Sequence, residues 1–336
     1  MDGPILVMGA TGFVGQHLVP NLVGQGLSVR CASRHPFAAS RANPRLPWIF
    51  ADVTQRPSLL RAMRGCSAVV YLVHRMADAT DLEQEERAAA EVVAQVAEES
   101  GVGRIVYLGG VAPETSPSEH LKSRLITGDV LRGGAVPTLE LRAGMIVGAQ
   151  SASWRIVRDL ALRLPLMILP RWLKNRSQPV AIDDVIAAIS HGLTAEVPYR
   201  GWYDIPGPDI LTSTEILMTI AALQGSRPLA VSVPLVTPRL SSYWIGLVTR
   251  ADLAVARQLV DGLTSDLIAL GPTFWSEMGD HTRLTFKEAA ALALAAEKGQ
   301  LPLSPTLLEE VVRRVSRPAK QEMPQTPQTA TPEKSH

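Results

Sequence analysis

The chain has 336 residues, of which 46% are hydrophobic and 19% are charged, so it is long enough for one large domain or two unequal ones. Its 33 basic and 32 acidic residues give a formal net charge of +1, which provides no overall field for nucleic acid or another polyanion. The longest apolar runs are far below the roughly 18 to 20 residues that cross a bilayer, so we expect no nucleic-acid partner and no transmembrane segment.

The first half of the chain alternates short apolar segments with longer segments of helical pattern. Strands are expected at 5–8, 28–32, 48–50, 68–73, 104–108 and 138–141. Helices are expected between them at 12–25, 57–64, 81–100 and 118–132. Short runs rich in Val, Ile and Leu between helices are typical of a parallel sheet covered on both faces. We therefore predict the α/β class, with a Rossmann-like doubly wound parallel sheet.

The expected helix at 81–100 has an apolar side and an acidic side. Its apolar residues recur at helical spacing, at Leu82, Ala89, Val92, Val93 and Val96. Its glutamates occupy the other positions: Glu83, Glu85, Glu86, Glu91, Glu98 and Glu99. We expect these glutamates to form a solvated face, and a contact with another subunit is the alternative.

The alternation ends near residue 150. Further helices are expected at 185–193, 213–224 and 286–298, separated by turns that contain Pro and Gly. The predicted organisation is a Rossmann domain at 1–150, a smaller, mainly helical lobe for a substrate or a protein partner at 151–316, and a disordered tail at 317–336.

The chain contains two cysteines, Cys31 and Cys66, and its first residues do not form a signal peptide. Two cysteines cannot supply a disulfide framework for a chain of this length, and no Cys/His cluster indicates a metal site. We expect a reducing, cytoplasmic compartment.

A glycine-rich segment, 9–15, follows the first strand and opens the first helix. Glycines at this spacing allow a tight turn, a close backbone approach to a pyrophosphate and close packing of helix on strand. The helix N-terminus offers unpaired N–H groups to the phosphates. The sequence therefore predicts a bound dinucleotide, in contact with Gly9, Thr11, Gly12, Phe13, Val14 and Gly15.

The end of the second strand selects between the two nicotinamide dinucleotides. An acidic residue there binds the ribose 2′-hydroxyl of NAD, yet no Asp or Glu occurs from Gly3 to Ala51. Arginines gather after this strand instead, and Arg34 with Ser33 is placed to bind the 2′-phosphate of NADP. We expect NADP, with NAD as the alternative. A solvated basic loop is the other interpretation of this segment.

Four further positions are expected to contact the cofactor. Asp52, followed by Val53, is placed to bind the adenine amino group, or else to cap the next helix. Leu72 ends the fourth strand. Gly109 follows the fifth strand and either leaves room for the nicotinamide or forms a turn.

Several motifs resemble those of atypical, extended-like short-chain dehydrogenase/reductases, over roughly residues 4 to 215. They are TGFVG at 11–15, DV at 52–53, IVYLG at 105–109, LRAGMIVG at 141–148 and PVAIDDV at 179–185. This group includes NmrA-like proteins and relatives of the accessory nucleotide-binding subunit of respiratory complex I. The runs YLVH at 71–74, PRW at 170–172 and PRLSSYW at 238–244 resemble a bacterial subgroup often labelled nucleoside-diphosphate-sugar epimerase. The resemblance implies a Rossmann sheet, a bound dinucleotide and a C-terminal substrate lobe.

The sequence departs from this family in its proton-transfer pair. Active members carry Tyr-x-x-x-Lys on the helix after the fifth strand, but no tyrosine of this chain has a lysine four residues later. The corresponding position holds His120 and Arg124, which one helical turn places on the same face. Arg124 opposes protonation of His120 and so favours a neutral imidazole. A helix cap or a solvated side chain is the alternative for His120.

His74 follows the fourth strand and is expected at the same crevice, because ligands of doubly wound sheets bind beyond the carboxyl ends of the strands. One interpretation of His74 is a second proton relay, and a structural histidine is the alternative. His120, Arg124 and His74 are thus the candidate catalytic residues.

Two functions stay open at this point. One is an NADP(H)-dependent oxidoreductase acting on a small molecule, although the missing pair leaves catalysis itself undecided. The other is a dinucleotide-binding redox sensor or a partner in a larger assembly, because fold alone does not decide function. Epimerase activity would normally need the missing pair. The oligomeric state is not predicted.

Overall fold

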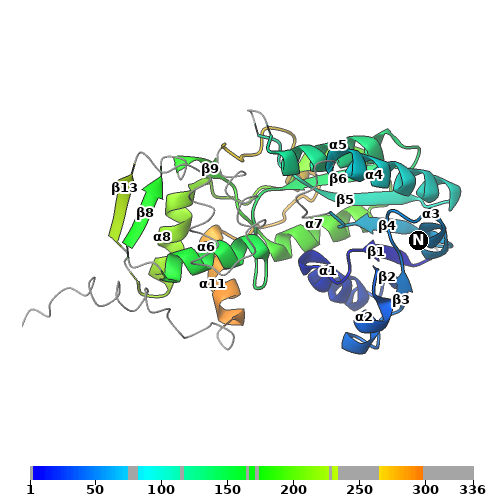
Figure 1. The fold of residues 1–336 in the computed structure, drawn as a ribbon, viewed down its shortest axis with the longest axis horizontal. Coiled ribbons are helices and arrows are strands. Elements are labelled where there is room, and N and C mark those ends of the chain that lie inside the picture. Colours follow the sequence, from blue (N-terminus) through cyan, green and yellow to red (C-terminus); the bar gives the residue numbers. More distant parts are fainter. Residues whose placement is uncertain are drawn as a thin grey trace, which may run out of the picture.

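The computed structural model describes residues 3–74, 82–113, 117–163, 166–170, 174–226, 229–233 and 265–297. The molecule is elongated, with a large sheet at one end and a small ribbon of two strands, β8 (Leu166–Pro170) and β13 (Leu229–Val233), at the other (Figure 1). The motif residues 171–172 and 238–244 and the tail expected at 317–336 lie outside the described residues.

The large sheet has seven strands in the order β11-β6-β5-β4-β1-β2-β3, and every neighbouring pair is parallel. The strands are β1 (Ile5–Met8), β2 (Val29–Ser33), β3 (Trp48–Phe50), β4 (Ala68–Tyr71), β5 (Arg104–Gly110), β6 (Thr138–Ala143) and β11 (Gly201–Asp204). The order of the first six is that of a doubly wound dinucleotide-binding fold. The predicted fold class is confirmed.

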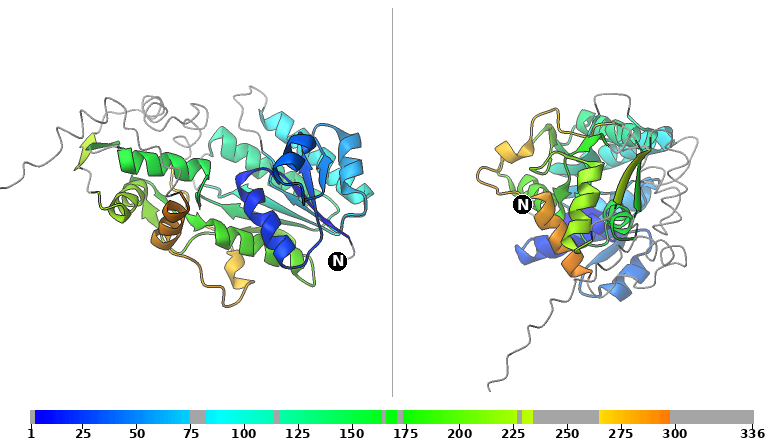
Figure 2. Two further views of the ribbon diagram at one scale, coloured as in Figure 1. Left: turned by 90° about the horizontal axis from the view of Figure 1, so that it is seen from below. Right: turned by 90° about the vertical axis from the view of Figure 1, so that its left-hand side faces the viewer.

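Helices cover both faces of this sheet (Figure 2). One face packs against α1 (Phe13–Gly24) and α7 (Ile182–Thr194). The other packs against α3 (Arg56–Met63), α4 (Leu82–Glu99) and α5 (Glu119–Gly133). Alternate residues of each strand point to opposite faces, and the two cores divide β1 accordingly, with Val7 in the first and Leu6 in the second.

A strand and a helix from beyond residue 150 belong to the large sheet and its covering layer. β11 pairs with β6, and α7 contributes Val185, Ile186 and Ile189 to the core that it shares with α1. Residues 182–205 therefore pack on the same sheet as the first 150 residues. The division of the chain at residue 150 stays a prediction.

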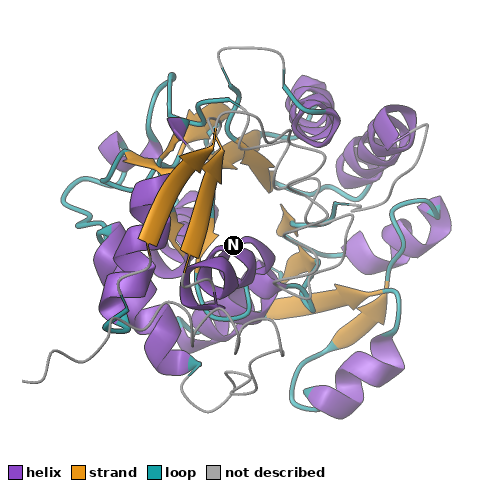
Figure 3. Cartoon of the chain, turned by 60° about the vertical axis from the view of Figure 1, so that its left-hand side comes forward, coloured by secondary structure: helices purple, strands orange, loops and turns teal. Residues whose placement is uncertain are grey.

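A third core lies toward the β8–β13 end, which Figure 3 brings forward. It joins α6 (Ala152–Arg163), α8 (Ser213–Leu223) and α11 (Phe286–Ala296) around Trp154, which is fully buried. Capping boxes at Thr212 and Thr285 begin the last two helices. The remaining elements are α2 (Pro36–Ala42), β7 (Ile146–Val147), β9 (Arg176–Ser177), β10 (Val180–Ala181), β12 (Leu211–Thr212) and the 3₁₀ turn η2 (Phe274–Ser276).

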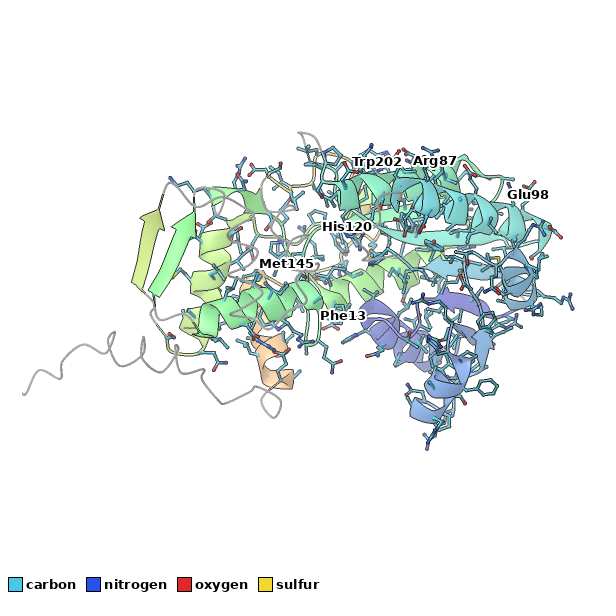
Figure 4. The ribbon with its side chains drawn as sticks, viewed as in Figure 1. Phe13, Arg87, Glu98, His120, Met145 and Trp202 are labelled. Atoms are coloured by element: carbon cyan, nitrogen blue, oxygen red, sulfur yellow. The ribbon has the colours of Figure 1, made fainter. Side chains whose placement is uncertain are left out.

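The acidic side of α4 differs from the expectation at one position. Most of its glutamates are exposed, as is Glu98, which Figure 4 labels toward the right-hand edge of the molecule. Glu86, however, is only 6% exposed. It precedes Ala90 and Val93 by four and seven positions, so helical spacing puts it on the stripe that packs against the sheet. The prediction that Glu86 is solvated is wrong.

Candidate functional site

The glycine segment forms a turn that needs glycine at particular positions. Gly9 has a φ of +89°, and a Cβ there would lie 3.1 Å from the Cβ of Leu72 at the end of β4. Gly12 is the N-cap of α1 and has no side chain to cap the helix. The first N–H groups of the helix can therefore donate to a ligand. Thr11 and Gly12 are exposed. These features fit a pyrophosphate at the start of α1.

Gly15 and Gly148 allow close packing around this turn. A Cβ on Gly15 would lie 2.3 Å from the carbonyl oxygen of Gly9 and 2.7 Å from the Cα of Ala10. A Cβ on Gly148 would lie 2.8 Å from Phe13 Cζ. Gly15 therefore sets the distance between α1 and the glycine turn, and Gly148 holds the segment after β6 against the start of α1. Val14 packs partly buried on the same core.

The end of β2 presents polar and basic groups to solvent. Ser33 Oγ accepts a hydrogen bond of 3.0 Å from the His35 amide, and Arg34 is exposed. Arg41 and Arg45 are exposed on the chain that follows. A guanidinium at this position remains available to a ribose phosphate.

Asp52 holds the turn after β3. Its Oδ1 accepts hydrogen bonds from the amide of Thr54 at 2.9 Å and from the Thr54 hydroxyl at 2.8 Å. The next helix, α3, has Gln55 as its N-cap, so Asp52 fastens the turn and does not cap the helix. Val53 packs partly buried against the core under α3 and α4. A role of Asp52 in adenine recognition stays a prediction.

The three candidate catalytic residues lie together beyond the carboxyl ends of β4 and β5. Arg124 Nη2 donates to His74 Nε2 at 2.7 Å. The rings of His74 and His120 meet edge to face, with centroids 6.3 Å apart. Ser118 caps α5 by accepting from the Leu121 amide, so His120 lies in the first turn and Arg124 one turn later. Figure 4 shows His120 between the sheet and the β8–β13 end, together with Phe13 and Met145.

The hydrogen-bond pattern fixes the tautomer of His74. A guanidinium can only donate, so Nε2 of a neutral His74 accepts and its proton resides on Nδ1. This Nδ1, His120 Nδ1 and Arg124 Nε are shielded from solvent and have no hydrogen-bond partner among the residues that the structure describes. Buried donors without acceptors are destabilising, so this cluster is incomplete as it stands.

Both imidazoles are held in the neutral form. The positive charge of Arg124, with burial and His120 adding to it, lowers the pKa of His74 well below its ordinary value. Burial, followed by the charge of Arg124, lowers the pKa of His120 to about 4. The expectation of a neutral His120 beside Arg124 agrees with this electrostatic environment.

Three residues that the sequence did not connect with Arg124 surround it. Gly110, at the end of β5, would bring a Cβ to 3.4 Å from Arg124 Cδ. Tyr107 donates from its hydroxyl to the Arg124 carbonyl oxygen at 3.0 Å. Glu86 on α4 supports the charge on Arg124, whereas burial lowers the pKa of this guanidinium. Glu86 was recognisable from its helical spacing with Ala90.

Gly109 faces a different group from the one expected. A Cβ there would lie 3.0 Å from Glu140 Oε1, and a Cβ on Gly128 of α5 would lie 2.4 Å from Glu140 Cδ. Glu140 is fully buried and accepts from Arg132 Nε and Arg142 Nε, each at 2.8 Å. The side of Gly109 where a Cβ would project is therefore occupied by the Glu140 carboxylate, which links α5 to β6. Room for the nicotinamide beside Gly109 stays a prediction.

Within the described part of the chain, no three residues of the metal-binding types His, Cys, Asp and Glu are grouped closely enough to hold a metal ion. No helix in the described ranges has both the length and the apolar character that crossing a membrane requires.

Known proteins resemble this chain in sequence. Residues 9–163 match the model of a family described as NAD(P)H-binding. A mitochondrial NADH dehydrogenase [ubiquinone] 1 alpha subcomplex subunit 9 from Arabidopsis thaliana is 25% identical over 68% of this chain. That match spans 60% of the subunit, less than two thirds of its length. A ceramide reductase from Caulobacter vibrioides is 26% identical over 69% of this chain and 74% of its own.

The match of residues 9–163 to an NAD(P)H-binding family and the two relatives support the resemblance to atypical short-chain dehydrogenase/reductases that the motifs carry. Among solved structures, the NAD complex of UDP-glucose 4-epimerase from Thermus thermophilus aligns with a TM-score of 0.65 at 18% identity, covering 89% of this chain and all of that one. At this identity the likeness concerns the fold. The NAD(P)H-binding domain thus brings its glycine turn and the His74, His120 and Arg124 cluster to the same edge of the sheet.

Proposed function

We propose that this chain is an NADP(H)-dependent oxidoreductase acting on a small molecule. The observation that carries the proposal is the convergence of His74, His120 and Arg124 beyond the carboxyl ends of β4 and β5. In doubly wound sheets this edge holds the ligand, and the dinucleotide phosphates fit the start of α1. The three candidate catalytic residues and the proposed dinucleotide would therefore lie at the same edge of the sheet.

The preference for NADP is supported by the end of β2. Arg34 is exposed there beside Ser33, and the chain has no acidic residue from Gly3 to Ala51 to bind a ribose 2′-hydroxyl. A guanidinium can bind a phosphate through two parallel hydrogen bonds. The proposed contacts of the remaining dinucleotide are Gly9, Thr11, Gly12, Phe13, Val14, Gly15, Asp52, Val53, Leu72 and Gly109.

A nicotinamide dinucleotide held at the glycine turn would supply the hydride chemistry between a carbonyl and an alcohol. His120 replaces the absent tyrosine as the group that handles the proton. In the direction of reduction, a neutral imidazole donates its N–H proton to the carbonyl oxygen and regains one from the solvent at its other nitrogen, so that each turnover consumes one proton. Burial, together with the charge of Arg124, lowers the pKa of His120 and keeps it neutral at pH 7, so His120 remains able to act in either direction.

The cofactor part is tested by calorimetric titration with NADPH and NADH. We expect NADPH to bind more tightly, and Arg34→Ala to remove the preference. Arg61→Ala, an exposed arginine on α3, is the matched control and should bind as the wild type does. Equal affinity of the wild type for the two dinucleotides would reject the NADP preference, and binding of neither would reject the oxidoreductase.

The catalytic part is tested by NADPH turnover on carbonyl substrates. Replacing a positioned proton-transfer group usually lowers the rate about 100-fold or more, so His120→Gln should lose turnover while still binding NADPH. Unchanged turnover in this variant would remove His120 from the mechanism.

A second function is supported by the relative from respiratory complex I. That protein is a subunit of NADH dehydrogenase, and this chain resembles it over 243 residues. The alternative is a chain that binds the dinucleotide and serves as a redox sensor or an assembly partner without turnover. It predicts NADPH binding with no turnover on any carbonyl substrate, and co-purification with a larger complex.

A further inference from the structure

We propose that Arg124, held in place by His74, binds a carboxylate of the substrate, next to the carbon whose oxygen faces His120. The substrate class is then a small oxo acid or hydroxy acid. This inference rests on the proposed oxidoreductase function for the identity of the reacting group, but binding of the carboxylate itself needs neither cofactor nor turnover.

The first argument is charge. Among the described residues, Arg124 forms no ion pair, and the one side-chain hydrogen bond of its guanidinium goes to His74. The neutral imidazole of His74 brings no negative charge. Glu86 acts on Arg124 through the electrostatic effect of its charge. Arg124 is only partly exposed and its Nε is shielded, so a charge without a close counter-charge is unfavourable there, and an anion beside the guanidinium would balance it.

The second argument is the set of unused donors. The tautomer of His74 places a proton on Nδ1, and Arg124 keeps a proton on Nε. Both atoms are shielded and have no acceptor within the described ranges. A carboxylate is an acceptor only, and one of its oxygens can take the proton of Arg124 Nε, whereas His74 Nδ1 points away from the guanidinium and needs a separate acceptor. A neutral carbonyl has one oxygen and would leave the charge of Arg124 unbalanced.

The third argument is the position of the cluster. The dinucleotide phosphates have their own place at the start of α1, where Gly12 leaves the N–H groups uncapped. His74 and Arg124 lie instead at the ends of β4 and on α5, with the ring of His120 6.3 Å from that of His74. A carboxylate on Arg124 would therefore hold an adjacent oxygen toward His120, which is the group proposed to move the proton.

The test uses the full chain without cofactor and acetate as the probe, at pH 7 and constant ionic strength. Acetamide is the uncharged isostere, and inorganic phosphate is the competing anion. We expect acetate to raise Tm saturably, by roughly 2 °C at ten times Kd, and acetamide to have no such effect. Arg124→Gln should lose the response. Lys122→Gln, an exposed lysine on the same helix, should keep it.

An independent measurement on the wild type covers the case in which Arg124→Gln does not fold. Acetate beside Arg124 reduces its effect on the imidazoles, so NMR titration should show the pKa of His74 and that of His120 rise on saturation with acetate but not with acetamide. The proposal is overturned if acetate acts no more strongly than chloride, if phosphate acts equally well, or if Arg124→Gln responds like the wild type.

The outcomes separate this inference from the proposed function. Acetate binding without NADPH turnover on any oxo acid would support the carboxylate site and reject the oxidoreductase. Turnover on uncharged ketones without any acetate response would keep the oxidoreductase and reject the carboxylate site.

Discussion

Arg124 on α5 and His74 after β4 are 50 positions apart in sequence and are joined by a hydrogen bond of 2.7 Å between Nη2 and Nε2. The bond ties the first turns of α5 to the end of the central strands. It also orients the His74 ring, because the guanidinium can only donate and Nε2 must face it as the acceptor. The relative position of α5 and the sheet therefore controls the geometry of the whole cluster.

The close approach of α1 to the glycine turn predicts a strong effect of Gly15→Ala. The added Cβ would lie 2.3 Å from the Gly9 carbonyl oxygen, so the turn must move and NADPH affinity should fall at least 10-fold. Gly24→Ala is the control in the same helix, where nothing lies within 4 Å of the new Cβ. Calorimetric titration of both variants measures this, and equal affinities would contradict the assigned role of Gly15.

The packing of α5 on Glu140 predicts a loss of stability in Gly128→Ala. Its Cβ would lie 2.4 Å from Glu140 Cδ, which is a buried carboxylate held by Arg132 and Arg142. Overpacking of this kind costs about 1 to 3 kcal/mol of unfolding free energy. Gly133→Ala, at the end of the same helix with open space around it, should cost much less. Urea unfolding compares the two, and the reverse order would show that α5 can shift away from Glu140.

The depressed pKa of His120 predicts a pH dependence of stability. Unfolded histidine has a pKa near 6.5 and folded His120 one of about 4, so the unfolded chain binds more protons between these values. The free energy of unfolding should therefore fall as the pH decreases from 6.5 toward 4. Between pH 7 and pH 5 the loss in His120→Gln should be smaller than in the wild type by about 1 to 2 kcal/mol. Equal losses in urea unfolding would mean that His120 is protonated in the folded chain.

The contact between α7 and the segment before α11 depends on Asp184. Its Oδ1 accepts from His281 Nε2 at 2.9 Å, and its Oδ2 accepts from the Leu284 amide at 3.1 Å. Asp184→Ala removes both acceptors and should lower the unfolding free energy by about 2 kcal/mol. Asp183→Ala, the exposed neighbour, is the control and should have little effect. Similar denaturation midpoints for the two variants would show that the contact contributes nothing.

The strands and the glycine turn were predictable because their patterns are local. The expected strand at 48–50 coincides with β3, and those at 5–8 and 28–32 match β1 and β2 within one residue. The helix α2 was not expected, since only Ala39 of its residues is buried and no apolar stripe marks it. β11 was also not expected, because its four residues become a strand only by pairing with β6.

The candidate cluster was predictable in part. One helical turn between His120 and Arg124 put both on one side of α5, and the end of β4 put His74 at the same edge of the sheet. The bond between Arg124 and His74, and the shielded nitrogens that it leaves without acceptors, depend on the packing of α5 against β5. Sequence spacing carries no information about that packing.

The late arrival of β11 has a consequence for how the protein is made. Until residues 201–204 emerge from the ribosome, β6 is the edge of a parallel sheet with unpaired N–H and C=O groups. The apolar face that α7 covers is exposed over the same period. A polypeptide cut after residue 150 would keep both surfaces open and should aggregate through them. The nucleotide-binding part therefore reaches a soluble, closed form only when the chain beyond residue 200 has been synthesised.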